Sequence, residues 1–521
     1  MPGYSHGQLL KAVVAKLRCK PSVLSNVRIV RRSVDARRGS PRVVIVVEVD
    51  VKGKRPSGKT DVEVVHGGED VFRPAALKKY RGLQPVVVGA GPAGLMAAFS
   101  LAESGMKPLL IERGEDASSR SNRVESFWKD GVLDGESNVL YGEGGAGLFS
   151  DGKLTSRSKD RPRVRRVLEI FVSCGASPDI LIDAEPHIGS DVLQNLLPAL
   201  RQRIVEMGGE VRFGAKLDTV MIESGALRGV VISGEEVRTD CCVLATGHSA
   251  RDVYAMLADV GVPLEAKPFA VGVRVEIPQK RIDVAQWGGS FASLGSASFR
   301  MTRREEDDAR ACYTFCMCPG GLVISCASSP GLITSNGMSL SKRDRPFGNA
   351  AFLVPVGADD FSGCGGDGVN PVLAGIEFQR GLEAAAFAAG GSDYGLPAQR
   401  LIEFLEGSTP SELPENRSCA RARPVQLRGL LPEFVENTLR SAMPKMLRGM
   451  RGLLLEETLL YASETRSSSP VRIMRGNDGQ SSGVRGLYPC GEGAGYAGGI
   501  VSSGIDGLRC GENVERGTLD A

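Results

Sequence analysis

Residues 85–112 read PVVVGAGPAGLMAAFSLAESGMKPLLIE, and this stretch decides the expected fold. A short apolar run leads into the glycine turn GAGPAG at 89–94. A helix pattern follows over 95–104, and a second apolar run at 108–111 ends in Glu112. The pattern predicts a strand, a helix and a second strand, which form one βαβ unit of a buried parallel sheet.

The residues of the turn have separate roles in a dinucleotide site. Gly89 permits the tight turn, Gly91 leaves room for a pyrophosphate against the backbone, and Gly94 lets the helix pack close to the strand. Pro92 and Ala93 begin the helix, whose free N–H groups and positive dipole end favour phosphate. The context of strand, turn and helix makes a glycine turn without a ligand the minor alternative.

An acidic residue ends the second strand, as a dinucleotide site requires. Glu112 lies 18 residues beyond Gly94 and is expected to accept hydrogen bonds from ribose hydroxyls. Arg113 follows it, and we count it among the cofactor-binding residues. This unit alone does not distinguish FAD from NAD.

A second glycine-dense segment near the C-terminus favours FAD. Residues 486–500 read GLYPCGEGAGYAGGI, which predicts an apolar strand, a turn and the start of a helix. A flavin is long, so a separate part of the chain must meet its ring, and a helix N-terminus there would stabilise negative charge on reduction. The alternative is a packed terminal helix without a ligand. The residues expected to contact the flavin are Gly491, Glu492, Gly493, Gly498, Gly499 and Ile500.

Two weaker segments add to this site. Ala245, Thr246 and Gly247 end an apolar strand and are expected to close the dinucleotide-binding sheet. Residues 141–154, YGEGGAGLFSDGKL, predict a backbone close to a ligand, with Gly147 and Ser150 near the flavin. A glycine-rich surface loop is an equal alternative for this last segment.

The remaining pattern predicts an α/β protein with a doubly wound, Rossmann-type FAD-binding domain at 84–254 and 480–521. An inserted mixed α+β substrate or cap domain is expected at 255–479, and a small α+β domain at 1–80. Within the FAD domain, Ser190 is expected to cap a helix over 190–208. Short strands near 211–213, 219–222, 227–232 and 241–244 predict an antiparallel meander that leads into a buried strand.

Composition limits the class of protein more than its partners. The net charge of +3 decides little, and twelve scattered cysteines without a secretory pattern predict reduced thiols. With only four histidines and no paired spacing, no metal site is expected. We expect a soluble cytoplasmic protein without a membrane span or nucleic-acid partner. An organelle, plastid or mitochondrion, is the alternative, because no acidic residue precedes Asp35.

Together these segments resemble a widely distributed FAD-dependent dehydrogenase family within the glutathione-reductase-like flavoproteins. Besides 141–157 and 486–500, the matching stretches are KPFAVGVRVEIPQ (267–279), CYTFCMCPGG (312–321), AGIEFQR (374–380), ETRSSSPVRI (464–473) and, in the N-terminal domain, RRSVDARR (31–38). The resemblance implies FAD, redox chemistry and an inserted substrate domain. Related reductases usually carry Gly-Asp where this chain has Gly491-Glu492, so the ribityl contact is expected to differ.

We therefore expect an FAD-dependent oxidoreductase that transfers a hydride between an organic substrate and the flavin. Lys153, Glu377 and Arg466 are the candidate catalytic residues, and Arg380 and Arg472 are further candidates for substrate or flavin contacts. Structural ion pairing is an equal alternative for the arginines and Glu377. An NAD(P)H-fed reductase or monooxygenase, with NAD(P)H as a transient co-substrate, is the first alternative function. An FAD-binding protein with a structural, sensing or RNA-docking role is the second.

One cysteine pair is a candidate for a redox-active disulfide. Cys316 and Cys318 are the nearest match to the redox-active disulfide of some related reductases. Because free cysteines are commonly buried, a structural role is favoured for both thiols.

Overall fold

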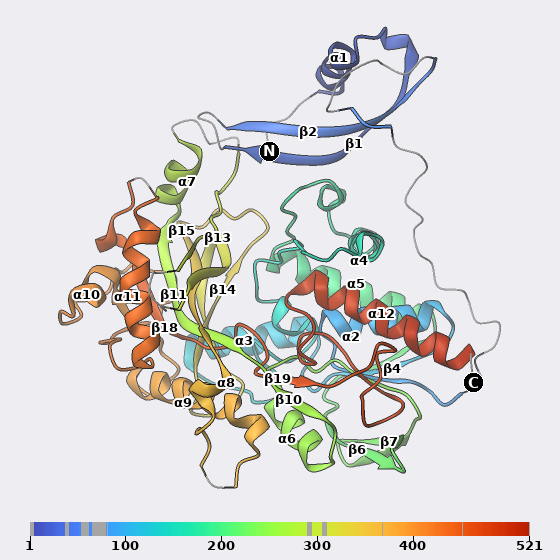
Figure 1. The fold of residues 1–521 in the computed structure, drawn as a ribbon, viewed down its shortest axis with the longest axis vertical. Coiled ribbons are helices and arrows are strands. Elements are labelled where there is room, and N and C mark those ends of the chain that lie inside the picture. Colours follow the sequence, from blue (N-terminus) through green and yellow to red (C-terminus); the bar gives the residue numbers. More distant parts are fainter. Residues whose placement is uncertain are drawn as a thin grey trace.

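The computed structural model describes residues 5–36, 41–53, 62–64, 80, 82–288, 294–304, 310–366, 368–450 and 452–519. Two sheets carry the architecture, one parallel and one mixed, and a separate N-terminal hairpin lies beside them (Figure 1). None of the helices in these ranges is both long and apolar enough to cross a bilayer.

A five-stranded parallel sheet forms the centre of the region that is expected to bind FAD, here called the FAD-binding part. Its strands are β3 (Val86–Val88), β4 (Leu109–Ile111), β5 (Glu210–Arg212), β9 (Cys242–Leu244) and β20 (Leu487–Pro489). The spatial order is β20-β9-β3-β4-β5, and all four pairings are parallel. If the five strands are numbered in chain order and read from β5 to β20, the order is 3-2-1-4-5, as in the Rossmann fold. The expected doubly wound sheet is confirmed.

Helices cover one face of this sheet and share one apolar core with it. They are α2 (Pro92–Glu103), α3 (Ala117–Asp130), α4 (Arg161–Ser173), α5 (Ser190–Glu206) and α12 (Ile500–Leu519). Helix α12 runs beside α2 (Figure 1), and a Cβ on Gly507 would lie only 2.1 Å from the carbonyl oxygen of Ala93. The backbones are therefore in contact, and glycine is required there. Gly507 lies against the first turn of α2. Helix α12 begins seven residues before Gly507, so its start lies about 10 Å from this contact along the helix axis.

The opposite face carries a three-stranded antiparallel meander and helix α6 (Arg251–Asp259). The meander is β6 (Leu217–Glu223), β7 (Ala226–Ile232) and β8 (Glu235–Arg238). The prediction that 211–213 belongs to this meander is wrong, because β5 pairs with β4 at the edge of the parallel sheet. The helix predicted over 190–208 is confirmed as α5, which ends at Glu206, and Gly189 rather than Ser190 is its N-cap.

The cap is built on an eight-stranded mixed sheet in the order β12-β13-β15-β11-β18-β16-β17, with β14 paired to β13. The bounds are β11 (Phe269–Pro278), β12 (Thr302–Arg303), β13 (Cys312–Cys326), β14 (Thr334–Ser339), β15 (Phe347–Val356), β16 (Pro397–Arg400), β17 (Arg423–Pro424) and β18 (Leu459–Glu464). Its helices are α7 (Gln279–Trp287), α8 (Ala358–Phe361), α9 (Ala374–Ala389), α10 (Leu401–Glu406) and α11 (Glu433–Leu447). Helix α11 packs its apolar side on β11 and β15.

The chain enters and leaves the cap at one place. Strands β10 (Leu264–Ala266) and β19 (Val471–Ile473) pair antiparallel and join the cap to the FAD-binding part. The division at 84–254, 255–479 and 480–521 is in keeping with these sheets, and its boundaries stay a prediction.

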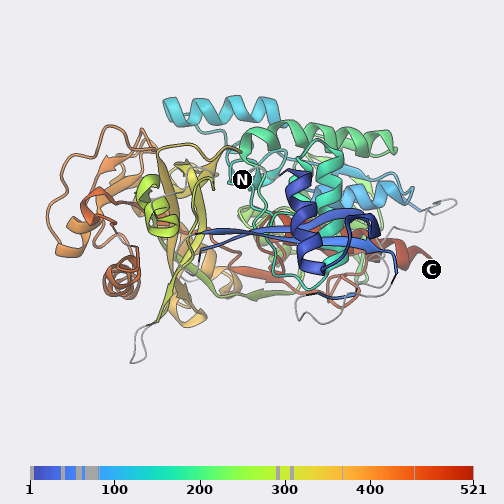
Figure 2. The same ribbon diagram turned by 90° about the horizontal axis from the view of Figure 1, so that it is seen from above.

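The N-terminal unit consists of α1 (His6–Leu17) and a hairpin of β1 (Leu24–Asp35) and β2 (Arg42–Val51), which crosses the molecule in Figure 2. It docks through Arg32, whose guanidinium donates to Asp183 at 2.7 and 3.0 Å and whose N–H donates to the carbonyl of Ile182. Arg37 and Arg38 of the basic run lie outside the described residues.

Candidate active site

A large cavity lies where the parallel sheet reverses its strand order, between β3 and β9, and extends to the cap. Its volume is about 1690 Å³ with the open mouth included. Most of the predicted site residues line it: Gly89, Gly91, Pro92, Ala93, Glu112, Arg113, Gly147, Ser150, Lys153, Ala245, Thr246, Gly247, Arg466, Glu492, Gly499 and Ile500. The predicted residues Gly94, Glu377, Gly491, Gly493 and Gly498 are not among the lining residues.

The first glycine turn closes one end of the cavity. Gly89 has φ +99°, and a Cβ on it would lie 2.5 Å from the carbonyl oxygen of Ala245. A Cβ on Gly94 would lie 1.8 Å from the carbonyl oxygen of Gly89. Gly91, the N-cap of α2, receives no side-chain cap, so the first N–H groups of this helix remain available to an anion.

Glu112 supports this turn as well as lining the cavity. Its buried carboxylate accepts hydrogen bonds from the backbone N–H of Ala90 at 2.8 Å, Gly114 at 3.0 Å and Gly142 at 2.9 Å. The carboxylate therefore connects the glycine turn to two loops. This supporting role was not part of the prediction, which was a contact with ribose. Arg113 is held beside it by Asp252 at 3.0 Å.

The second glycine turn packs against the first turn and against the segment 245–247. A Cβ on Gly491 would lie 2.7 Å from the Cβ of Ala93, and one on Gly493 would lie 2.6 Å from the carbonyl oxygen of Gly247. Gly499, with φ +94°, Ile500 and Ser503 place the start of α12 in the cavity wall. Gly491 and Gly493 thus shape the turn from behind rather than facing the cavity.

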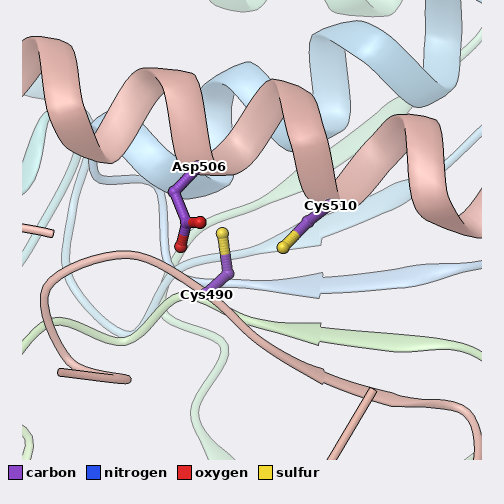
Figure 3. Close-up of side chains that lie close together, drawn as sticks. All are labelled: Cys490, Asp506 and Cys510. Atoms are coloured by element: carbon purple, nitrogen blue, oxygen red, sulfur yellow. The ribbon is translucent and has the colours of Figure 1, made fainter. Parts of the chain in front are cut away.

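A buried cluster holds this turn in place (Figure 3). Cys490, Asp506 and Cys510 have ligand-type atoms within 4.8 Å of one another. However, Asp506 accepts two hydrogen bonds from Arg475, at 2.7 and 2.9 Å, and a third from the N–H of Gly491 at 2.7 Å. A cation would have to compete with a guanidinium already in place, so we interpret the cluster as a clamp on the turn.

Lys153 projects from the segment 141–154 into the same cavity. Its Nζ lies 3.0 Å from Oδ2 of Asp151, a buried carboxylate that also accepts two hydrogen bonds from Arg343. Burial opposes the charge of Lys153, but Asp151, Cys318 and Cys316 together outweigh it and the pKa of the ammonium is raised. Lys153 is therefore a cation at neutral pH.

Arg466 lines the cavity and belongs to a buried network of three charged side chains. It donates to Glu383 at 3.0 and 2.8 Å, and Arg251 of α6 donates to the same carboxylate at 2.8 and 2.7 Å. Burial opposes ionisation of Glu383, but Arg466 and Arg251 outweigh it and hold its pKa far below the usual range. Two guanidiniums share one carboxylate, so one positive charge remains. The network also joins the cap to the FAD-binding part.

The prediction that Glu377 lies in the active site is wrong. Its side chain is 35% exposed and lies 3.7 Å from that of Arg380, away from the cavity, whereas Glu383 on the same helix is fully buried. Arg380 is also exposed, and Arg472 pairs with Glu265 outside the cavity. Helical spacing could have identified Glu383, because it shares a buried stripe with Ile376, Gln379 and Ala386.

Two further lining residues, His248 and Asn336, were not predicted from the sequence, and no local motif marks them. Tyr141, Cys316 and Glu464 also line the cavity and belong to the stretches on which the family resemblance rests. Burial, and then Arg466 and Arg251, lower the pKa of His248 to about 3, so its ring is neutral. Burial raises the pKa of Glu492 to about 7, with Cys316 acting in the same direction.

The cavity fits FAD. The uncapped start of α2 suits a diphosphate, and the start of α12, about 10 Å further on, suits the charged edge of a flavin ring. Gly91 and Gly499 present bare backbone to the cavity: a Cβ on Gly91 would have nothing nearer than 3.9 Å, and one on Gly499 nothing within 4 Å. The space that side chains would fill is therefore free for a ligand.

Comparisons with known proteins agree with this geometry. Residues 268–467 match the family described as "FAD-dependent protein, C-terminal domain-like", and residues 87–146 match an NAD(P)-binding Rossmann-like domain. A Clostridium beijerinckii protein described as uncharacterized is 39% identical over 519 residues, covering 97% of this chain and 95% of its own.

Two further similarities are weaker. Thiamine thiazole synthase of Aeropyrum pernix is 29% identical over 192 residues, which cover 34% of this chain and 58% of the synthase. The structure of E. coli quinol fumarate reductase aligns with 84% of this chain and 71% of its own, at 14% identity and a TM-score of 0.38. The full-length relative and the two domain matches show that the chain belongs to the family of FAD-dependent proteins and is an FAD-dependent oxidoreductase.

Proposed function

We propose that the chain oxidises an organic small molecule that carries an anionic group, in the part of the cavity between the flavin site and the cap. Bound FAD supplies two-electron redox chemistry. The observation that carries the proposal is the continuity of one cavity from the start of α2 to Lys153 and Arg466.

The FAD-binding part would hold the cofactor mainly through its backbone. The start of α2 at Gly91 and Ala93 would receive the diphosphate, and Glu112 and Arg113 lie where the ribose is expected. The start of α12 at Gly499 would face the flavin ring, where its dipole favours added negative charge. Lys153 adds a fixed positive charge on the same side.

The cap would orient the substrate through side chains. Arg466 faces the cavity from a network that retains one positive charge, which favours a carboxylate or phosphate on the substrate. Asn336 and Ser335 line the same region and offer neutral hydrogen-bonding groups. His248, neutral because of its lowered pKa, offers a hydrogen-bonding ring without a charge.

Anaerobic visible spectroscopy of the purified protein tests this. We expect an oxidised-flavin band that persists with NADH or NADPH and bleaches with a carboxylate or phosphate substrate from a metabolite panel. Bleaching by NADPH or NADH alone would instead identify a nicotinamide-fed reductase or oxygenase. Lys153→Ala and Arg466→Ala should slow single-turnover flavin reduction, and an unchanged rate would remove that residue from the site.

A further inference from the structure

Cys316 is turned into the cavity by a β-bulge. From Phe315 to Cys318, strand β13 advances three residues while its partner β15 advances two, from Ala351 to Asn349. The extra residue lets Cys316 adopt a left-handed φ of +46°, rare for a side chain other than glycine. Bulges next to active sites re-aim a side chain, and here Cys316 lines the cavity half-buried while Cys318 lies buried behind it.

Neighbouring groups hold the bulge and surround its thiol with charge. Arg274 donates to the carbonyl oxygen of Cys316 at 3.2 Å and is itself held by Glu464 at 2.7 and 3.0 Å. Lys153 is the second cation; its buried Nζ has Asp151 as an ion-pair partner but makes no hydrogen bond of good geometry within the described residues.

The charged and titratable groups that face Cys316 are Cys318, Lys153, Arg274, Glu464 and Glu492. A hydrogen bond from Cys318 lowers the pKa of Cys316 most, and Lys153 and Arg274 add to it against burial and Glu464, so the pKa falls to about 6. The pKa of Cys318 is raised by the same pairing. The Cys318 thiol also donates to the carbonyl oxygen of Cys316 at 3.4 Å, so the thiol of Cys318 lies beside Cys316.

The pair lies at the end of the cavity assigned to the flavin ring. Glu492 and the start of α12 line this end, and Cys316 is close enough to Glu492 to raise the pKa of that carboxyl. None of the other ten cysteines combines a cavity position with an adjacent thiol partner and a neighbouring lysine.

We propose that Cys316 and Cys318 form a dithiol that exchanges two electrons with the bound flavin and connects it to a thiol or disulfide substrate. The proposal deepens the proposed function and rests on it. In the forward step the Cys316 thiolate and the Cys318 thiol form one S–S bond and release two electrons and the proton of Cys318. Oxidised flavin takes up the two electrons and that proton, so atoms and charge balance. A dithiol substrate then regenerates the pair by exchange at Cys316, the sulfur that faces the cavity.

Anaerobic dithionite titration of the reconstituted, mildly oxidised protein tests the proposal. A flavin and a disulfide each accept an electron pair, so the wild type should take up about four electrons per flavin and Cys318→Ser or Cys316→Ala about two. Cys364→Ser is the matched control, a half-buried cysteine outside the cavity, and it should keep the wild-type count. Alkylation followed by mass mapping should show residues 316 and 318 protected in the oxidised protein and modified after reduction.

The outcomes separate this inference from the function on which it rests. A wild type that binds flavin, takes up about two electrons and leaves both thiols open to alkylation would overturn the dithiol alone. A protein that binds no flavin would overturn both. If Cys318→Ser does not fold, Cys316→Ala still decides, because its side chain is only half-buried.

Discussion

The two walls of the cavity are built in different ways. The wall of the FAD-binding part is mainly backbone: glycine turns at 89–94 and 491–499, the start of α2, which has no side-chain cap, and the start of α12. The cap wall is side-chain charge, where Arg466 of the cap meets Glu383 of α9 and Arg251 of α6. A site made of backbone groups needs a contiguous sequence motif, whereas a site made of charged side chains is assembled from distant positions. The backbone wall should therefore be sensitive to changes in chain conformation, and the charged wall to the loss of an ion-pair partner.

Removing the shared carboxylate should have the largest effect. Glu383→Gln leaves two buried guanidiniums without a counter-charge, and breaking such pairs costs about 3–5 kcal/mol of unfolding free energy. Urea unfolding at neutral pH measures this loss. The matched control is Glu377→Gln on the same helix, an exposed residue that should change stability by less than about 0.5 kcal/mol.

The network also predicts the direction of a pH effect. Because the folded pKa of Glu383 lies below its unfolded value of about 4.3, its stabilisation is complete above that pH and is lost as pH falls toward the folded pKa. The stability difference between wild type and Glu383→Gln should therefore shrink on acidification. A difference independent of pH would mean that the carboxylate is not paired as described.

A change in the backbone wall should weaken cofactor binding first. Gly94→Ala places a Cβ 1.8 Å from the carbonyl oxygen of Gly89, and such overpacking costs about 1–3 kcal/mol. Since the strain falls on the turn below the start of α2, we expect FAD affinity to fall about tenfold or more by fluorescence titration. Gly381→Ala in α9, where a Cβ has open space, is the control. Equal FAD affinity in both variants would show that the turn does not shape the cofactor site.

The smallest predicted effect is on thiol reactivity at the junction of the walls. Lys153→Met removes a cation that lowers the pKa of Cys316. A rise of about one unit would slow alkylation of Cys316 about fivefold at pH 6, because the thiolate is the nucleophile. Lys216→Met is the control, a lysine at the other end of the cavity that pairs with Asp252. If both variants share one pH profile, Lys153 does not act on the thiol.

The same contrast explains what the sequence could predict. The turn at 89–94, its flanking elements and the C-terminal turn could be predicted because each motif is local and each glycine answers one steric need, as at Gly94. The sequence analysis names Glu377 and not Glu383, because charge alone does not show which side of α9 is buried. The helical spacing of the buried residues identifies the side on which Glu383 lies. The strand at 211–213 was assigned to the wrong sheet because its pairing with β4 spans about a hundred residues.

Cys316 shows the limit more sharply. The strand pattern of 312–326 gives no sign of the extra residue in β13, since a bulge depends on register with β15. Without the bulge, the position of Cys316 in the cavity and its approach to Lys153 could not be foreseen, and a structural role was the reasonable prediction.

Hydrogen exchange of the protein with and without FAD tests the central claim most directly. One cofactor spanning the cavity should slow exchange at residues 93–95, 145–153 and 499–503 together, at one flavin per chain. Protection confined to the first segment, or no protection at saturating FAD, would contradict a single FAD held by both glycine turns.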